Sequence, residues 1–362
     1  MKVAIITFHR AINYGAVLQA YALQKTLNNN NISSDIIDYR GLYDFKSKSL
    51  NLKELAKRII WLKKYVQVNQ KKQKFNNFLK KNMTFTPEIE KDELSNLNEL
   101  YDCFISGSDQ VWNLDITKQD SAFFLDFVDE KKKRKTYAAS FGYNNIPEKY
   151  MKTTVEYLSH FSSILVRESG AAEWIRRKTN LKCDVVCDPT FFLDASEWNK
   201  IEKKPNYVKE PFIIIYTIAQ AEHLIELAIK YSKQFNYHIY YIRTAPFKDI
   251  VGIESLYNVG PEELLYFIHH SKCVFTSSFH GLALSVKYNT PFVYEANESI
   301  NNNVSRLSSL AKLLNIESRE AQTISSTFWK DSIDWQTINK KVKVLQNESL
   351  VKLMKSLEEN NV

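Results

Sequence analysis

The sequence predicts an α/β protein of two Rossmann-like, doubly wound domains, and three observations support this. Short apolar runs of strand length alternate with helical patterns along most of the chain, which is typical of parallel sheets with crossover helices. The alternation restarts after Pro211. The length of 362 residues also exceeds the size at which one hydrophobic core usually stops growing. We therefore expect two domains that face each other across a cleft.

In the first half, apolar runs indicate strands and the longer amphipathic segments indicate helices. The expected strands are residues 2–7, 34–39, 103–106, 135–139, 163–166 and 184–187, and the expected helices are 14–28 and 169–179. The first apolar run is broken at once by His9 and Arg10, so it lacks the apolar core of a signal peptide. We expect a cytoplasmic protein.

The second half repeats this order after a segment of mixed charge, residues 194–210, which is the best linker candidate. Its expected strands are 212–216, 238–243, 272–276 and 291–294, with helical segments over 221–235, 261–271 and 281–288. The tail has spaced apolar positions typical of terminal helices. The expected units are residues 1–195, 206–326 and a helical tail over 327–362.

Charge and cysteine content narrow the class of partner. The formal net charge of +8 favours anionic partners such as phosphorylated substrates, acidic lipids or nucleic acid. No apolar run reaches the length of a membrane helix. The four cysteines lie in or beside apolar runs, and the spacing of Cys183 and Cys187 matches no usual zinc motif. We expect reduced, buried thiols and no metal site.

Residues 46–81 form a basic amphipathic insertion with twelve Lys or Arg and one acid, Glu54. One interpretation is an arm on an anionic membrane face, near a lipid-linked substrate. The favoured interpretation is a solvated helix packed on its own domain. The segment carries no recognition motif for nucleic acid, so we expect no such partner.

Ligands of open α/β sheets bind beyond the carboxyl ends of the strands, where three loops of the first half carry suitable residues. Asn13 and Gly15 follow the first strand, either as a ligand-binding turn or as an ordinary helix cap, and no GxGxxG motif is present. Asp109 and Gln110 follow the strand at 103–106. Arg167 follows the strand at 163–166 and can bind a carboxylate or phosphate as a planar fork.

The segment Cys187–Thr190 follows the last strand of the first half, and we expect it to close the interdomain cleft. In the second half, Ser277, Ser278, His280 and Gly281 lie between a strand and a helix. Hydroxyls and free amides at a helix N-terminus can hold a phosphate beside the histidine, whereas the alternative is a capping serine and a structural histidine.

Together these segments resemble the polysaccharide pyruvyl transferase family. The resemblance covers about residues 1–325 and rests on Asn13–Leu23 (NYGAVLQAYAL), Ser106–Trp112 (SGSDQVW), Tyr137–Gly142 (YAASFG), Val166–Gly170 (VRESG), Cys187–Leu193 (CDPTFFL), Ser277–Ser285 (SSFHGLALS) and Asn303–Leu307 (NVSRL), with a later Arg319.

The resemblance implies a GT-B-like fold and transfer of the enolpyruvyl unit of phosphoenolpyruvate to a sugar, as a cyclic ketal in glycan biosynthesis. It implies no cofactor, and a lipid-linked glycan acceptor at the inner face of the plasma membrane. It assigns His280 to the donor phosphate, as ligand or proton donor. We assign Asp109 to activation of the sugar hydroxyl, and donor binding to Arg167 and the turn at 277–281.

Many relatives carry an arginine two residues before this histidine, where this chain has Ser278. Either Arg306 or Arg319 supplies the missing cation, or the donor substrate differs. The main alternative function is a GT-B glycosyltransferase that uses a nucleotide sugar. Such an enzyme would have a base-and-ribose pocket in the second domain, and Glu295 and Glu298 could be misread as its ribose-binding acid. A noncatalytic anion-binding or membrane scaffold is the second.

Overall fold

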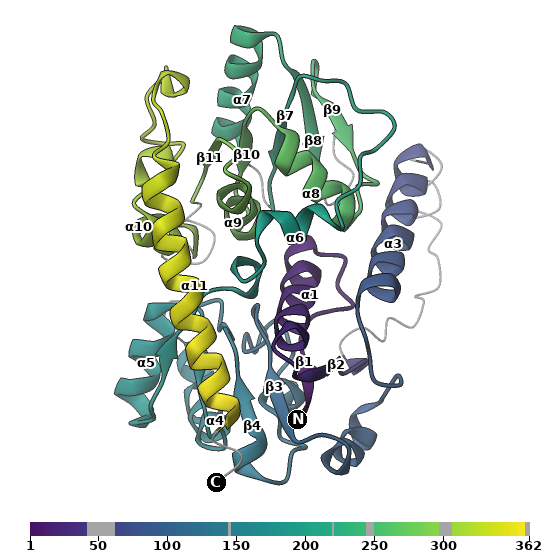
Figure 1. The fold of residues 1–362 in the computed structure, drawn as a ribbon, viewed down its shortest axis with the longest axis vertical. Coiled ribbons are helices and arrows are strands. Elements are labelled where there is room, and N and C mark those ends of the chain that lie inside the picture. The colour runs from purple at the N-terminus through teal and green to yellow at the C-terminus, as the bar shows by residue number, and fades with distance from the viewer. Residues whose placement is uncertain (42–61, 144–145, 219–220, 244–249, 297–305, 359–362) are drawn as a thin grey trace.

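The computed structural model describes residues 1–41, 62–143, 146–218, 221–243, 250–296 and 306–358. It contains two parallel sheets, one in each half of the chain, with helices packed around them (Figure 1). Each expected strand overlaps an observed one, so the expected fold class is confirmed. Central strands such as Phe212–Tyr216 are buried along their whole length, which is why they read as unbroken apolar runs.

The N-terminal sheet has the order β2-β1-β3-β4, and isolated bridges from Lys135 to Ser163 and from Ala139 to Val166 attach the pair β5-β6 beyond β4. The strands are β1 Lys2–Ile6, β2 Ser33–Ile36, β3 Cys103–Ser106, β4 Arg134–Thr136, β5 Leu165–Val166 and β6 Asp184–Val185. The accompanying helices are α1 Tyr14–Asn29, α3 Leu62–Asn82, α4 Glu148–Ser159, α5 Ser169–Thr179 and α6 Ala195–Asn199.

The C-terminal sheet has the order β11-β10-β7-β8-β9. Its strands are β7 Phe212–Tyr216, β8 His238–Ile242, β9 Glu254–Leu256, β10 Val274–Thr276 and β11 Phe292–Tyr294. The helices are α7 Glu222–Phe235, α8 Pro261–His270, α9 Phe279–Tyr288, α10 Arg306–Leu314 and α11 Trp335–Glu358. Strand β9 and helices α4 and α10 were not expected. Strand β9 is a three-residue edge strand with one buried position, so its hydrophobic signal is weak.

Helix α11 runs back from the C-terminal half along the N-terminal half (Figure 1). Ser349 Oγ accepts a hydrogen bond of 2.9 Å from the amide of Cys187, and Lys352 Nζ donates to the carbonyl of Val185. The tail therefore joins the two halves. Among the described residues, no helix is both long and apolar enough to cross a membrane.

One hydrophobic cluster runs through both halves and includes Val17 and Leu18 of α1 with Leu264 of α8 and Leu282 of α9. The hydroxyl of Tyr14 donates to the carbonyl of Val259 across this contact. The shared core fixes the N-terminus of α1 against that of α9.

Candidate active site

The buried carboxylate of Asp188 lies at the centre of the candidate site. Its Oδ2 accepts hydrogen bonds from Arg167 Nη1 at 2.9 Å and Ser108 Oγ at 3.0 Å. Its Oδ1 accepts from the amide and hydroxyl of Thr190 at 3.0 and 2.7 Å. These contacts join the loops after β3, β5 and β6. The predicted role of Cys187–Thr190 in closing the cleft did not single out Asp188.

His280 approaches this carboxylate from the C-terminal half. Its Nε2 lies 3.5 Å from Asp188 Oδ2 and makes no hydrogen bond within the described residues. Burial acts to raise the pKa of Asp188, but the charges of His280 and Arg167 hold that pKa well below its ordinary value. The result is an ionised carboxylate that can stabilise positive charge on the imidazole.

Gly15 is in direct contact with the other edge of the His280 ring. A Cβ at Gly15 would lie 2.0 Å from His280 Nδ1, so any side chain would displace the imidazole. Asn13 is a helix cap, because its Oδ1 accepts from the amides of Gly15 and Ala16 at the start of α1. In the structure, the turn of Asn13 and Gly15 therefore packs against the ring of His280 and fixes its position.

Asp109 lies between two arginines. Its Oδ1 is 3.9 Å from Arg167 Nη2 and 3.7 Å from Arg306 Nη1. Asp109 has a φ of 76°, a region costly for residues with a side chain, and such strain is often found at functional sites. The side chain of Gln110 contacts neighbouring loop residues instead. Its Oε1 accepts a hydrogen bond from Asn113 Nδ2 and packs against Gly142.

Arg167 is almost fully buried and its Nη2 makes no hydrogen bond within the described part of the chain. Its Nε donates to Glu168 at 3.0 Å, and its guanidinium lies 4.9 Å from the ring centroid of Phe279. Arg306 is 27% exposed, and burial together with the charge of Arg167 lowers its pKa. Two neighbouring guanidinium groups of this kind favour an anionic ligand.

The hydroxyls of the Ser277–Gly281 turn are engaged by the protein. Ser277 Oγ accepts from the amide of Ile218, and Ser278 caps α9 by accepting from the amide of Gly281. A Cβ at Gly281 would lie 2.3 Å from Thr276 Oγ1, so close packing requires glycine there. These residues build the turn that presents His280, and the phosphate cradle expected of Ser277, Ser278 and Gly281 stays a prediction, because a hydroxyl that accepts from an amide can still donate its own hydrogen.

Arg319 does not join the site, which corrects its assignment as a substrate ligand. Its guanidinium donates to the carbonyls of Phe328 and Asp331 in the segment before α11. Of the two arginines considered for the missing cation, Arg306 is the one beside Arg167. The 3₁₀ turn Glu317–Arg319 instead leads into Glu320, which pairs with Tyr294 of the edge strand β11.

A pocket of about 620 Å³, open mouth included, lies beside Arg167, Asp188 and Arg306. Its polar lining includes Arg167, Glu168, Asp188 and Arg306. Its apolar lining comes from both halves and from α11, namely Val185, Val186, Phe191, Phe279, Leu310, Leu313 and Leu345. Sequence reasoning missed Glu168 and Phe279, although both lie in the motifs that carried the resemblance.

The described part of the basic segment packs against the rest of the protein. Phe75 and Phe78 of α3 are core residues, and Lys74 pairs with Glu263 of α8 at 2.7 Å. Lys71 is 2% exposed and lies 4.3 Å from the ring centroid of Tyr14. The helix thus packs on both halves, beyond the favoured expectation of packing on its own domain. The remainder, residues 46–61, lies outside the described residues.

Two other expectations concern buried side chains. All four cysteines are free and buried, and burial raises the pKa of Cys183 to about 12 and that of Cys187 to about 11, so neither is a reactive thiolate. Glu295 is buried, and desolvation raises its pKa. Glu298 lies outside the described residues.

Solved structures with the same fold are distant in sequence. UDP-GlcNAc 2-epimerase from Neisseria meningitidis, bound to UDP-GlcNAc, has a TM-score of 0.52 at 10% identity, over 99% of this chain and 99% of that chain. The UDP-GlcNAc 2-epimerase of Methanocaldococcus jannaschii has a TM-score of 0.50 at 14% identity, over 96% and 93%. An alpha-glucosyltransferase in complex with UDP and a 13-mer DNA has a TM-score of 0.50 at 10% identity, over 99% and 95%. These similarities show the GT-B fold alone.

No curated protein sequence is significantly similar to this chain. The family model of polysaccharide pyruvyl transferases, however, matches residues 13–299. That range contains Gly15, Asp109, Arg167, Asp188 and His280, which the structure gathers at one junction. The chain therefore belongs to the polysaccharide pyruvyl transferase family and is a transferase.

Proposed function

We propose that the protein transfers the enolpyruvyl unit of phosphoenolpyruvate to a sugar and forms a cyclic pyruvate ketal. The observation that carries this proposal is the buried Arg167, whose Nη2 lacks a hydrogen-bond partner within the described residues. Arg167 lines a pocket together with Arg306 and with Asp188, whose Oδ2 lies 3.5 Å from His280 Nε2. A free donor of this kind suits the carboxylate or phosphate of a small anionic substrate.

Donor binding is proposed to rest on two arginines. Phosphoenolpyruvate carries a carboxylate and a phosphate, and Arg167 and Arg306 can each bind one of them. Arg306 takes the place of the arginine that relatives carry at the position of Ser278. The apolar wall near Phe279 and Leu310 suits the methylene carbon of the donor.

His280 is proposed as the acid that protonates the methylene carbon. The double bond then becomes a methyl group and an oxocarbenium-like centre, which one sugar hydroxyl attacks. A second hydroxyl of the same sugar displaces the phosphate and closes the ketal. Of the two hydroxyl protons, one restores His280 and the other leaves with the phosphate, so the reaction consumes neither redox equivalents nor water.

Asp109 is proposed to accept one of the two hydroxyl protons and to pass it to the departing phosphate, so that its carboxylate is restored. Its backbone is held by two hydrogen bonds to its carbonyl, from the amides of Val111 and Ser140. Its carboxylate lies at the two arginines, where the donor is proposed to bind. A preorganised base at that position can act without moving.

The acceptor is proposed to be a lipid-linked glycan at the inner face of the plasma membrane, in biosynthesis of a cell-surface polysaccharide. The net charge of +8 supports contact with an anionic surface. Among the described lysines of α3, Lys71 and Lys74 are engaged within the protein, whereas Lys72, Lys80 and Lys81 are exposed and available for such a contact.

The direct test is incubation of the purified protein with phosphoenolpyruvate and a panel of synthetic and lipid-linked glycosides. We expect a glycoside with the mass of the ketal and an equal amount of free phosphate, and neither product with the His280→Asn variant. Thermal stabilisation by UDP-, GDP- or CMP-sugars but not by phosphoenolpyruvate would contradict the proposal and favour a glycosyltransferase.

A further inference from the structure

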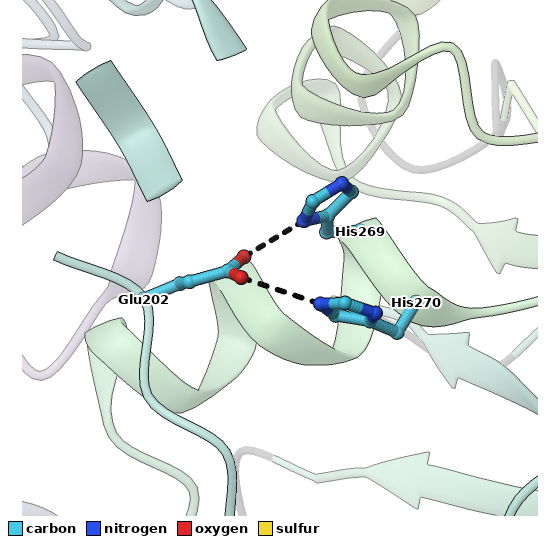
Figure 2. Close-up of side chains that lie close together, drawn as sticks. All are labelled: Glu202, His269 and His270. Carbon is cyan, nitrogen blue, oxygen red and sulfur yellow. Dashed lines mark hydrogen bonds and ion pairs between the residues drawn. The ribbon is translucent and has the colours of Figure 1, made fainter. Parts of the chain in front are cut away.

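A second polar cluster lies in the C-terminal half and consists of Glu202, His269 and His270 (Figure 2). Glu202 follows α6 in the segment that joins the two halves, and the two histidines end α8. Glu202 Oε2 lies 2.9 Å from His269 Nδ1, and Glu202 Oε1 lies 3.2 Å from His270 Nε2. The potential ligand atoms of the three residues lie within 4.8 Å of one another.

Aromatic neighbours orient both imidazoles. The ring of His269 stacks on Tyr288 with centroids 4.5 Å apart, and that of His270 stacks on Tyr266 at 4.3 Å. Rings held in this way direct their nitrogens at the carboxylate without a search through rotamers, and such support is a usual feature of metal sites.

Tyr288 adds an independent observation. It is 9% exposed, and its hydroxyl makes no hydrogen bond within the described residues. Its ring stacks on that of His269, with centroids 4.5 Å apart, so Tyr288 lies beside the cluster. A buried hydroxyl without a partner is unusual and is a sign of a missing water or ligand.

We propose that Glu202, His269 and His270 bind a divalent metal ion of the zinc class and so tie the interdomain segment to the C-terminal half. Two imidazoles and one carboxylate form a donor set that zinc accepts, with a water in the fourth position. That water would supply the hydrogen-bond partner that Tyr288 lacks.

This site is separate from the proposed active site. His280 is near the start of α9 and Tyr288 ends it, so eight residues separate them, on the order of 12 Å along the helix axis. His269 and His270 likewise end α8, just before β10 begins, whereas the active-site turn follows β10. The inference concerns assembly of the fold and does not rest on the proposed reaction.

A metal-free arrangement, in which both neutral imidazoles donate to Glu202, predicts no metal affinity and is therefore a testable alternative. The experiment uses tag-free, EDTA-treated protein that is titrated with Zn²⁺ by calorimetry, with metal content measured after dialysis. We expect about one zinc per chain, a higher Tm with zinc, and with Co²⁺ the intense visible absorption of a tetrahedral complex.

The variants Glu202→Gln and His270→Ala should lose at least about tenfold in zinc affinity. Circular dichroism checks that they are folded. The matched control is His238→Ala, because His238 also pairs with a carboxylate, Glu254, at 2.9 Å but has no second histidine beside it. Zinc binding should survive in this control. An absence of zinc binding by the unaltered protein, or equal binding in both site variants, would overturn the inference.

Discussion

His280 occupies space that exists only because residue 15 is a glycine. A Cβ at position 15 would lie 2.0 Å from His280 Nδ1, and the opposite edge of the ring faces Asp188 at 3.5 Å. His280 belongs to the C-terminal half of the chain. Its imidazole is therefore held between the backbone at Gly15 and the carboxylate of Asp188, which both belong to the N-terminal half.

The Gly15→Ala substitution should displace this imidazole. We expect kcat to fall by about 100-fold, because a misplacement of roughly 1 Å has that effect on a positioned catalytic group. Steady-state kinetics with phosphoenolpyruvate and an acceptor would measure it. Gly170→Ala is the control, since a Cβ there meets nothing within 4 Å. Unchanged kcat in Gly15→Ala would argue against a catalytic histidine.

Substitutions of Arg306 and of Arg319 should have different effects on the enzyme. Arg306→Ala should raise the KM for phosphoenolpyruvate by about 10- to 100-fold, because it removes one charged hydrogen bond to the donor. Arg319→Ala should leave that KM within about twofold and lower the stability instead, since its donors hold two backbone carbonyls. The opposite pattern would return Arg319 to the site.

Asp109→Asn should separate catalysis from folding. Asparagine tolerates the left-handed backbone at φ 76° and removes the charge, so we expect kcat to fall by about 100-fold with stability nearly unchanged. The KM for phosphoenolpyruvate should not rise, because the two arginines lose a competing carboxylate. Urea unfolding and kinetics measure the two effects. A normal kcat would exclude Asp109 as the base.

Asp188 should make stability depend on pH in the acid range. Its pKa is lowered on folding, so its ionised form stabilises the fold above the unfolded value, and this contribution is lost as the pH falls through the folded value. Asp188→Asn should therefore be less stable at pH 7 and lose less stability between about pH 5 and pH 2. Parallel acid-unfolding curves for the two proteins would contradict this.

The contribution of Lys71 to stability should have the opposite sign to that of Asp188, because its charged form destabilises the fold. Burial lowers its pKa to about 8, so the charged form destabilises the fold below that pH. Lys71→Met keeps most of the packing against Tyr14 and should raise stability at pH 7 by about 1–3 kcal/mol. The gain should shrink as the pH rises from about 8 toward the unfolded value near 10.5, measured by urea unfolding. A loss of stability would mean that the contact with Tyr14 outweighs desolvation.

The sequence by itself determined most of the strands and helices, and the strand ends from which the loops of the site emerge. Strands buried on both faces are continuous apolar runs, and the caps at Asn13 and Ser278 are local interactions. The motifs after β1, β3, β5 and β10 could therefore be placed at strand ends from the sequence alone. Their gathering at one site was an inference from the general rule for parallel sheets.

Only the tertiary structure decided which of these residues meet. The pairing of Asp188 with His280, the choice of Arg306 over Arg319 and the packing of α3 on both halves depend on how the two halves are oriented. Periodicity and capping act over a few residues, so they carry no information about contacts between distant segments. For the same reason, the sequence did not indicate that Glu202 lies beside His269 and His270. Only the path of the interdomain segment brings the three residues together.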